Sequence, residues 1–546
     1  MNAQATPVEH SPDATRSGGF LAKLERLGNK LPAPLWLFMF FAVMVAVGSW
    51  IGSALGLHAQ DPQTGETIYV TNLLTKQGIQ QMFSEAINNF TTFPPLGVII
   101  TVMFGVAVAE HSGLISALIR VMVARVGART ITFMLSLAGV TGSIASDAIY
   151  VILIPIGAIS FRALGRSPIV GAIVAFAASS AGFNASLILN ITDVLLGGIS
   201  TSAAHIVDES YEVSPLANYF FVIASTILLS LIITAVTELY MERKAHSIID
   251  HSAIDFSELS FANSEDSAAP SDSDTSTGTG ADSGAVSEKD LSLKPQEVKA
   301  LKVTGIAAAI YIACYFAALF APFSPLYSPE GPLEGPLIRA IAVPITAGFF
   351  ILGTVYGLAA KTITESADVP NFIAKGLAPL LPLIGLFLVL SQFLAWFKWS
   401  NLGVWLAIKG AELLQKWHLP LVVTFTLLVL MVALLNLLIT SGSAQWSLMA
   451  PIVVPMMMYI GVSPEVSQMI FRIGDSTTNI ITPMSPSFAL ALIFLQRYYK
   501  KAGVGTLFSL ALPYSLSMLI SWFLFFILWY FLGLPLGPGT PYTYPA

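Results

Sequence analysis

The sequence predicts an all-α polytopic membrane protein with nine transmembrane helices and two re-entrant hairpins, arranged as an inverted-topology repeat. Three observations support this fold class. Only 11% of the 546 residues are charged and 55% are apolar, which suits a surface that faces lipid rather than water. Apolar runs of bilayer-spanning length recur along the chain. Two pairs of motifs also appear in the same order in its two halves.

Nine apolar runs are predicted to cross the membrane, because a helix needs about 20 apolar residues to span a hydrocarbon core about 30 Å thick. The first run, 34–56, follows a polar leader (1–33) and is too long for a signal-peptide core, so we expect it to be retained. The other predicted spans lie near 95–111, 168–195, 214–240, 300–320, 337–360, 376–397, 466–496 and 506–532.

Two further runs, 130–160 and 419–460, are broken midway by Gly and small polar residues and are predicted to be hairpins. Basic residues indicate their orientation, because cytoplasmic loops are enriched in Lys and Arg. Such residues lie in the leader and on both flanks of the first hairpin, so we expect a cytoplasmic N-terminus and leader. The second hairpin then opens to the outside, and the tail 534–546 is external.

A segment rich in Ser, Asp, Ala and Gly, 245–298, separates the first membrane half (34–244) from the second (299–533). It has too little apolar surface to offset its chain entropy, so we expect a disordered acidic cytoplasmic linker. Two stretches, 72–90 and 399–416, are amphipathic. They are either helices on the membrane surface or ordinary loop helices.

Each half contains a hairpin, a Ser-Pro pair and then an interrupted helix. The hairpins contain TGSIASDAIYVILIP (141–155) and SGSAQWSLMAPIVVP (441–455). The interruptions are GFNASLILNITD (182–193) and GDSTTNIITPMSP (474–486). Unwound backbone at membrane depth is tolerated only beside protein or a water-filled cavity, and such breaks line the sites of secondary transporters. The alternative is that the small residues serve only close helix packing.

Ionisable side chains in the predicted spans are expected to have a specific role, because inserting each of them into the membrane costs about 2.5–3.5 kcal/mol. Asp193 and Asp475 lie at the two matched breaks and are our candidates for carboxylates that bind H⁺ or Na⁺. The alternative for each is a buried Asp that accepts backbone donors at a helix start. Arg472 is three residues from Asp475 and could pair with it. Asp147, in the first hairpin tip, is a ligand or a cap.

Neutral polar side chains surround the same breaks. Trp446 at the second tip could stack on an aromatic substrate, or it could wedge the hairpin against a neighbouring helix. The oxygen-bearing candidates are Ser143, Ser146, Asn184 and Asn190 in the first half and Asn436, Thr440, Ser441, Ser443, Gln445 and Asn479 in the second.

These motifs resemble the aminobenzoyl-glutamate transporter (AbgT) family over nearly the whole chain outside the leader and linker. The matching segments are ERLGNKLPAP, FPPLGVII, SIASDA, GFNASL, TDVLLGGIS, SGSAQWSLMAPIVVPM, FRIGDSTTNIITPMSP and GLPLGPG. The resemblance implies a homodimer, with functional positions at Asp193, Ser443, Trp446 and Asp475 and a candidate Na⁺ ligand at Asn436. The acidic linker departs from the family pattern.

We therefore expect a secondary active transporter in a bacterial inner (cytoplasmic) membrane. It would move p-aminobenzoyl-glutamate, related folate catabolites or sulfonamide-like antimetabolites by alternating access, coupled to H⁺ or Na⁺, in a direction that stays open. The substrate-binding candidates are Ser443, Trp446, Asn184, Ser146 and Asn479.

The alternatives are an exporter of sulfonamides only, an intramembrane enzyme and a channel. The chain has one cysteine, no HExxH motif and no basic cluster, so we expect no cofactor beyond the coupling ion and no nucleic-acid partner.

Overall fold

The protein is described here from a computed structural model that covers residues 34–62, 65–123, 130–142, 148–249, 254, 294–329, 331–332 and 335–545. Apart from a short antiparallel hairpin, β1 (His58–Gln60) with β2 (Thr67–Tyr69), the regular structure in these ranges is helical. The predictions for the leader, the first hairpin tip and nearly all of the linker lie outside the described residues. The predictions for Ser143, Ser146 and Asp147 are therefore outside the described part of the chain.

Within the described ranges, eight segments are long and apolar enough to cross a bilayer, and each coincides with a predicted span. The single helices among them are α2 (Pro34–Ala54), α5 (Pro94–His111), α14 (Pro295–Phe320), α16 (Ala342–Ala360) and α24 (Val504–Phe531). The composite ones are α11 (Tyr219–Val236) with α12 (Glu242–Ile248), α17 (Asp368–Leu377) with α18 (Leu381–Trp399), and α22 (Pro464–Thr478) with α23 (Pro486–Tyr498).

The ninth predicted span, 168–195, is divided between two shorter apolar helices, α9 (Pro168–Ala181) and α10 (Ile191–Ala204). The two halves thus share one arrangement, because α22 is also separated from the next helix, here α23, by a break that consists of a 3₁₀ turn (Asn479–Ile481) and a further turn at 482–485. In both halves the first of the two helices begins with proline, whose fixed φ suits the first helical position.

Both predicted hairpins are pairs of separate helices. The first pair is α7 (Ile131–Thr141) and α8 (Ala148–Ala163), and the second is α20 (Leu421–Asn436) and α21 (Gly442–Tyr459). The break in the second pair falls where Gly and small polar residues predicted it, and residues 143–147, between α7 and α8, lie outside the described part of the chain. That the hairpins are re-entrant remains a prediction.

The amphipathic stretches and the connections are short helices. Residues 72–90 form α3 (Lys76–Ser84) and most of α4 (Ala86–Thr91), and 399–416 form α19 (Leu402–Lys416). The sequence predicted neither α6 (Leu114–Val123) nor most of α17, and the short α15 (Pro336–Arg339) overlaps the start of the predicted span 337–360.

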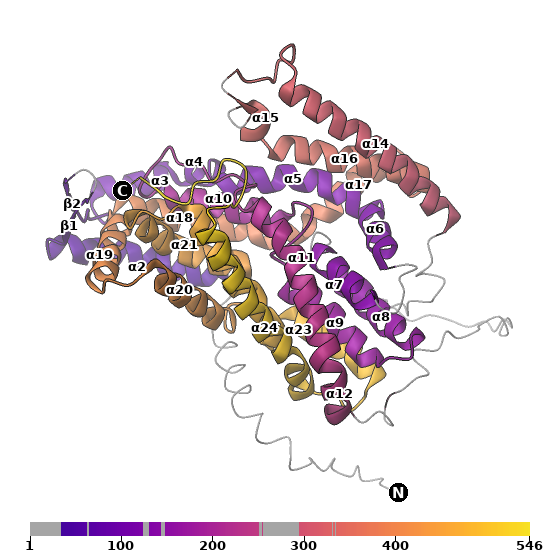
Figure 1. Ribbon diagram of the computed structural model, residues 1–546. Helices are drawn as coiled ribbons and strands as arrows, with labels where there is room; N and C mark the ends of the chain where they lie inside the picture. Colours follow the sequence, from indigo (N-terminus) through magenta and orange to yellow (C-terminus); the bar gives the residue numbers. More distant parts are fainter. Residues whose placement is uncertain are drawn as a thin grey trace, which may run out of the picture.

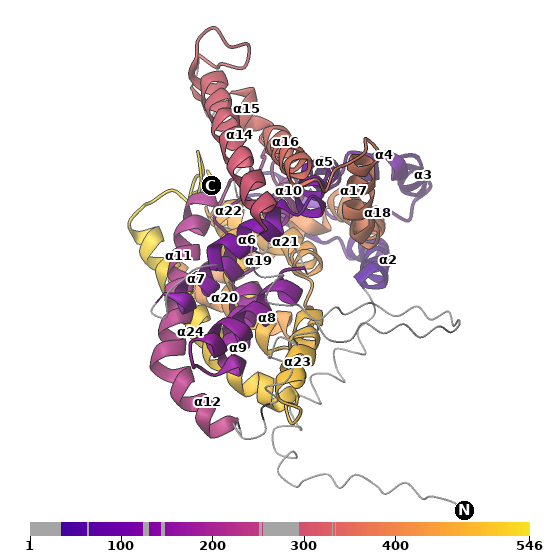
Figure 2. The ribbon, with the colours of Figure 1, turned by 90° about the vertical axis from the view of Figure 1, so that its right-hand side faces the viewer.

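The helices fall into two groups (Figures 1 and 2). The framework group consists of α2, α5, α14, α16, α17 and α18, in which α5 packs on α16 and α17, α14 on α16, and α2 on α18. The core group consists of α7 to α11 and α20 to α24. In Figure 2 the pair α14 and α16 rises at the top, away from most of the core helices. The two groups meet where α10 packs on α5.

Close helix packing in the core group depends on glycine. A Cβ atom on Gly171 of α9 would lie 2.1 Å from the carbonyl oxygen of Gly157 on α8, so the two backbones are in contact. Small residues allow such contacts in membrane proteins, where helix association relies on van der Waals packing.

The C-terminal tail is packed rather than free. The carbonyl oxygen of Leu536 accepts from the Phe221 amide at 3.0 Å, and that of Tyr542 accepts from the Ser463 amide at 3.1 Å. The Leu536 side chain is fully buried. The tail therefore connects the start of α11, in the first half, with the start of α22, in the second.

Candidate functional site

Three of the four predicted motifs meet around Asp475. Asn184, in the first interruption, donates from Nδ2 to Asp475 Oδ2 at 2.8 Å, and its backbone amide donates to Ser476 Oγ at 3.2 Å. At the second hairpin tip, a Cβ atom on Gly442 would lie 2.8 Å from Asp475 Oδ2. Glycine is therefore needed there for the tip to approach the carboxylate. The fourth motif, the first hairpin tip, lies outside the described residues.

A buried ion pair joins the two interrupted helices. The Arg472 guanidinium donates through Nη2 to Asp193 Oδ1, and both residues are at most 2% exposed. The expected pair between Arg472 and Asp475 is not found in the described part of the chain. The Asp475 carboxylate instead faces Asn184 and Gly442, whereas the guanidinium reaches α10.

Asp193 also caps the start of a helix, which was the alternative that the sequence offered to an ion-binding role. Its Oδ2 accepts from the Asn190 amide at 2.8 Å, and Asn190 Oδ1 accepts from the Asp193 amide at 3.1 Å. This reciprocal pair satisfies two donors at the start of α10. The same carboxylate thus fixes a helix start and neutralises a buried arginine.

Among the described residues, four buried oxygens at or near the junction of the second hairpin tip with the interrupted helices lack a hydrogen-bond donor. They are Asn184 Oδ1, Asn436 Oδ1, Gln445 Oε1 and Asp475 Oδ1. The amide orientations are determined by neighbouring acceptors, because Asn436 Nδ2 donates to Asp475 O at 2.6 Å and Gln445 Nε2 donates to Val432 O at 2.8 Å. The amide oxygens must therefore point away from those acceptors. Buried acceptors without donors are uncommon and are the ligands that hard cations prefer.

Asn436 connects α20 to the second interruption. Besides Asp475 O, its Nδ2 contacts Thr478 Oγ1 at 2.9 Å and Asn479 Oδ1 at 3.0 Å. The predicted candidates Asn436 and Asn479 are thus neighbours. Ser443 lies at the start of α21, where its hydroxyl is 3.3 Å from that of Ser441.

Trp446 is fully buried and has the alternative role that the sequence suggested, since it packs the second hairpin against neighbouring helices. Its ring stacks on Phe471 of α22 with centroids 4.6 Å apart, and its Nε1 donates to Ser200 Oγ on α10 at 3.0 Å. Stacking on a substrate would therefore require the indole to leave Phe471.

A hydrogen-bonded chain extends from Trp446 toward the C-terminal tail. Ser200 Oγ donates to Gln468 Oε1 at 2.7 Å, and Gln468 Nε2 donates to Asn218 Oδ1 at 2.9 Å. Asn218 Nδ2 then donates to the carbonyl oxygen of Glu465 at 3.0 Å. Neither Gln468 nor Glu465 was predicted as a site residue from the sequence. Polar residues at seven-residue spacing before Asp475 (Gln468 and Asp475) would have been the available signal.

Glu465 is buried at the start of α22, where a side chain of the loop 205–218 donates a hydrogen bond to its carboxylate. The Tyr211 hydroxyl donates to Glu465 Oε2 at 2.9 Å. Burial and the nearby Glu465 carboxylate raise the pKa of the Tyr211 phenol. In the same loop, hydrogen bonds from the Ser210 hydroxyl and amide lower the pKa of Asp208.

Comparison with known proteins identifies the family. The profile of the AbgT transporter family matches residues 19–262 and 275–544. The p-aminobenzoyl-glutamate transport protein of Escherichia coli is 34% identical over 530 residues, covering 97% of this chain and 98% of that protein.

Two solved structures are also similar. The Alcanivorax borkumensis YdaH transporter is 38% identical with a TM-score of 0.81, covering 93% of this chain and 100% of that one. Neisseria gonorrhoeae MtrF, of a class of antimetabolite efflux pumps, is 36% identical with a TM-score of 0.83, covering 96% of this chain and 100% of that one. Since the family and these relatives are transporters, the expectation of a transporter rather than an enzyme is confirmed. The chain belongs to the AbgT transporter family.

Proposed function

We propose that this chain is an ion-coupled secondary transporter of p-aminobenzoyl-glutamate or closely related aromatic dicarboxylates in the cytoplasmic membrane. The substrate class comes from the E. coli relative. We propose nine spanning helices, with the pair α9 and α10 as the ninth, two re-entrant hairpins, a cytoplasmic N-terminus, an external C-terminus and a homodimer. The eight long apolar segments and the matched breaks support this topology.

One observation carries the coupling proposal, namely the four buried oxygens without donors around Asp475. A proton would satisfy only a carboxylate, since amide oxygens are not protonated near neutral pH. Na⁺ can be bound by carboxylate and amide oxygens together. The oxygens of Asp475, Asn184, Asn436 and Gln445 therefore favour Na⁺ as the coupling ion over H⁺.

The substrate carries two carboxylates and an aromatic ring, so it needs donors and a flat apolar surface. The start of α21 offers hydroxyls, with Ser443 close to Ser441, and the positive end of a helix dipole. Trp446, one turn further on, would provide the ring surface after leaving Phe471. Asn184, which donates to Asp475, and Asn479, which accepts from Asn436, would complete the site.

The test is counterflow of labelled p-aminobenzoyl-glutamate in proteoliposomes under separately imposed Na⁺ and pH gradients. We expect a Na⁺ gradient to drive accumulation. Asp475→Asn should abolish this accumulation, because the site loses its charge, while the protein elutes as the wild type does on gel filtration. Asp208→Asn, at a half-buried position in the loop 205–218, is the matched control and should transport normally. Na⁺-driven flux that persists in Asp475→Asn would remove this carboxylate from coupling.

Export of sulfonamide-like antimetabolites is a second candidate, because MtrF belongs to a class of antimetabolite efflux pumps. The same vesicles distinguish the two. A sulfonamide that competes with p-aminobenzoyl-glutamate for one saturable site indicates a shared pathway. Sulfonamide flux without any flux of p-aminobenzoyl-glutamate would instead indicate an exporter only.

A further inference from the structure

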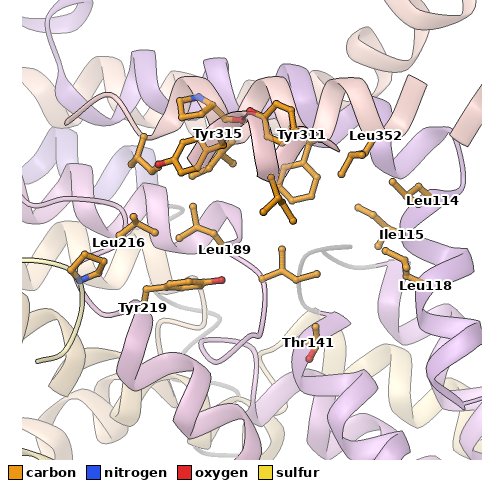
Figure 3. A pocket seen from close by; sticks show the side chains of 18 of the residues that line it. Leu114, Ile115, Leu118, Thr141, Leu189, Leu216, Tyr219, Tyr311, Tyr315 and Leu352 are labelled. Carbon is orange, nitrogen blue, oxygen red and sulfur yellow. Dashed lines mark hydrogen bonds between the residues drawn. The ribbon is translucent and has the colours of Figure 1, made fainter. Parts of the chain in front are cut away.

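A large cavity lies apart from the candidate site, between the framework group and the core group (Figure 3). Its volume is about 790 Å³. The framework side is formed by α14 and α16, including Tyr311 and Leu352, and α6 closes one end. The core side is formed by α7, the first interruption and the start of α11, including Leu189 and Tyr219.

The cavity lies at the depth of the hydrocarbon core. Tyr311 and Leu352 fall in the middle of two segments that are apolar and long enough to span a bilayer. The cavity is not fully enclosed, and two of its lining side chains, Phe220 and Phe316, are 43% and 51% exposed. In this part of α14 the exposed surface would face acyl chains, so the opening connects the cavity with lipid.

Among its described residues, the cavity wall offers few free polar groups. The Tyr311 hydroxyl donates to the Pro344 carbonyl at 2.5 Å, and the Tyr219 hydroxyl donates to the Leu187 carbonyl at 3.0 Å. Of the remaining described lining side chains, Thr141 carries a buried hydroxyl without a partner, and Tyr315 carries a second hydroxyl on the opposite wall (Figure 3). A buried water needs two to four polar partners, and a carboxylate without donors is strongly disfavoured in an apolar site. Water and an anionic substrate therefore both fit poorly.

An empty cavity of this size is also unfavourable, because the lining atoms lose their van der Waals partners. Apolar cavities of about 150 Å³ already bind benzene, and this one is about five times larger. We propose that the cavity holds an acyl chain of a membrane phospholipid, inserted between the framework and core groups. This inference does not depend on the identity of the transported substrate.

Photo-cross-linking tests the proposal. Full-length protein is reconstituted with a phospholipid that carries a diazirine within one acyl chain, irradiated, and mapped by peptide mass spectrometry. We expect cross-links on the cavity-lining parts of α14, α16 and 188–189. Ile345→Trp, which fills the cavity from α16, should reduce these cross-links several-fold. Ile351→Trp is the matched control, since it makes the same change on the same helix at a position that is 40% exposed and not part of the lining.

Leu189→Trp fills the cavity from the opposite wall and keeps the test valid if Ile345→Trp does not fold. Equal cross-linking of the lining in the wild type and in a folded filling variant would overturn the proposal. So would cross-links confined to the outer surface of α14. Labelling of the lining by a water-soluble carbene precursor, but not by the lipid, would show that the cavity is hydrated and would equally overturn it.

Discussion

Arg472 and Asp193 form an ion pair that is almost completely buried, and each residue needs the other. Removing one partner from such a pair leaves an uncompensated charge and typically costs about 3–5 kcal/mol, whereas replacing both can be nearly neutral. Because Arg472 Nε also lacks a partner, the Asp193 carboxylate is the charge that compensates this guanidinium.

We therefore predict that Arg472→Gln lowers the free energy of unfolding by about 3–5 kcal/mol, and that Arg472→Gln combined with Asp193→Asn recovers part of the loss. Thermal unfolding of the detergent-purified proteins measures both effects. Losses that simply add in the double variant would mean that the two side chains do not interact in the folded protein.

At the scale of helices, Ser200 connects three elements. Its hydroxyl accepts from Trp446 on α21 and donates to Gln468 on α22, while the residue itself belongs to α10. The second hairpin is thereby held against one helix of each half. Movement of the hairpin relative to α10 or α22 would break this connection.

Ser200→Ala should leave two buried polar atoms unpaired, at a cost of about 1–3 kcal/mol for each group. We predict lower thermal stability and a changed fluorescence of the Trp446 indole, measured against a Trp446→Phe background. Ser202→Ala, two residues along the same helix, is the control, because that hydroxyl donates only to the Gly198 carbonyl of its own helix. An equal effect of the two changes would contradict a connection through Ser200.

The elements were largely predictable and their contacts were not. Runs such as 34–56 and 506–532 are recognised by apolar length alone, and Gly-rich breaks predict where helices stop. The partner of Arg472 is 279 residues away, on the other interrupted helix, and no local spacing indicates it. Glu465 was missed because burial at a helix start is a tertiary property, created here by Tyr211 and the tail.

At the scale of the whole molecule, the C-terminal tail joins the two halves. Thr540 donates to the Ala217 carbonyl at 2.9 Å, and the Ser463 hydroxyl donates to the Pro541 carbonyl at 2.8 Å. The sequence predicted an external tail but did not predict its contacts with the two halves. The tail covers the region where Tyr211 binds Glu465, since Tyr544 packs edge-on against Tyr211 with ring centroids 5.7 Å apart.

Leu536 is the apolar anchor of the tail, so Leu536→Ala should cost about 2–5 kcal/mol of stability, as large-to-small changes in a packed interior do. Leu534→Ala, at a position that is 38% exposed, should have little effect. Chemical denaturation followed by circular dichroism compares the two variants. Similar denaturation midpoints would show that the tail does not stabilise the junction.

The oxygens without donors around Asp475 have a consequence for the sequence of events in a transport cycle. In the proposed Na⁺-coupled cycle, an ion-free junction between hairpin tip and interrupted helices would contain lone pairs that no described group satisfies, so the closed arrangement would be disfavoured. Entry of the ion would relieve this penalty before the organic solute arrives. A carrier built in this way should bind its partners in a fixed order, ion first, and should rarely cross the membrane half-loaded, which keeps the gradient from leaking away.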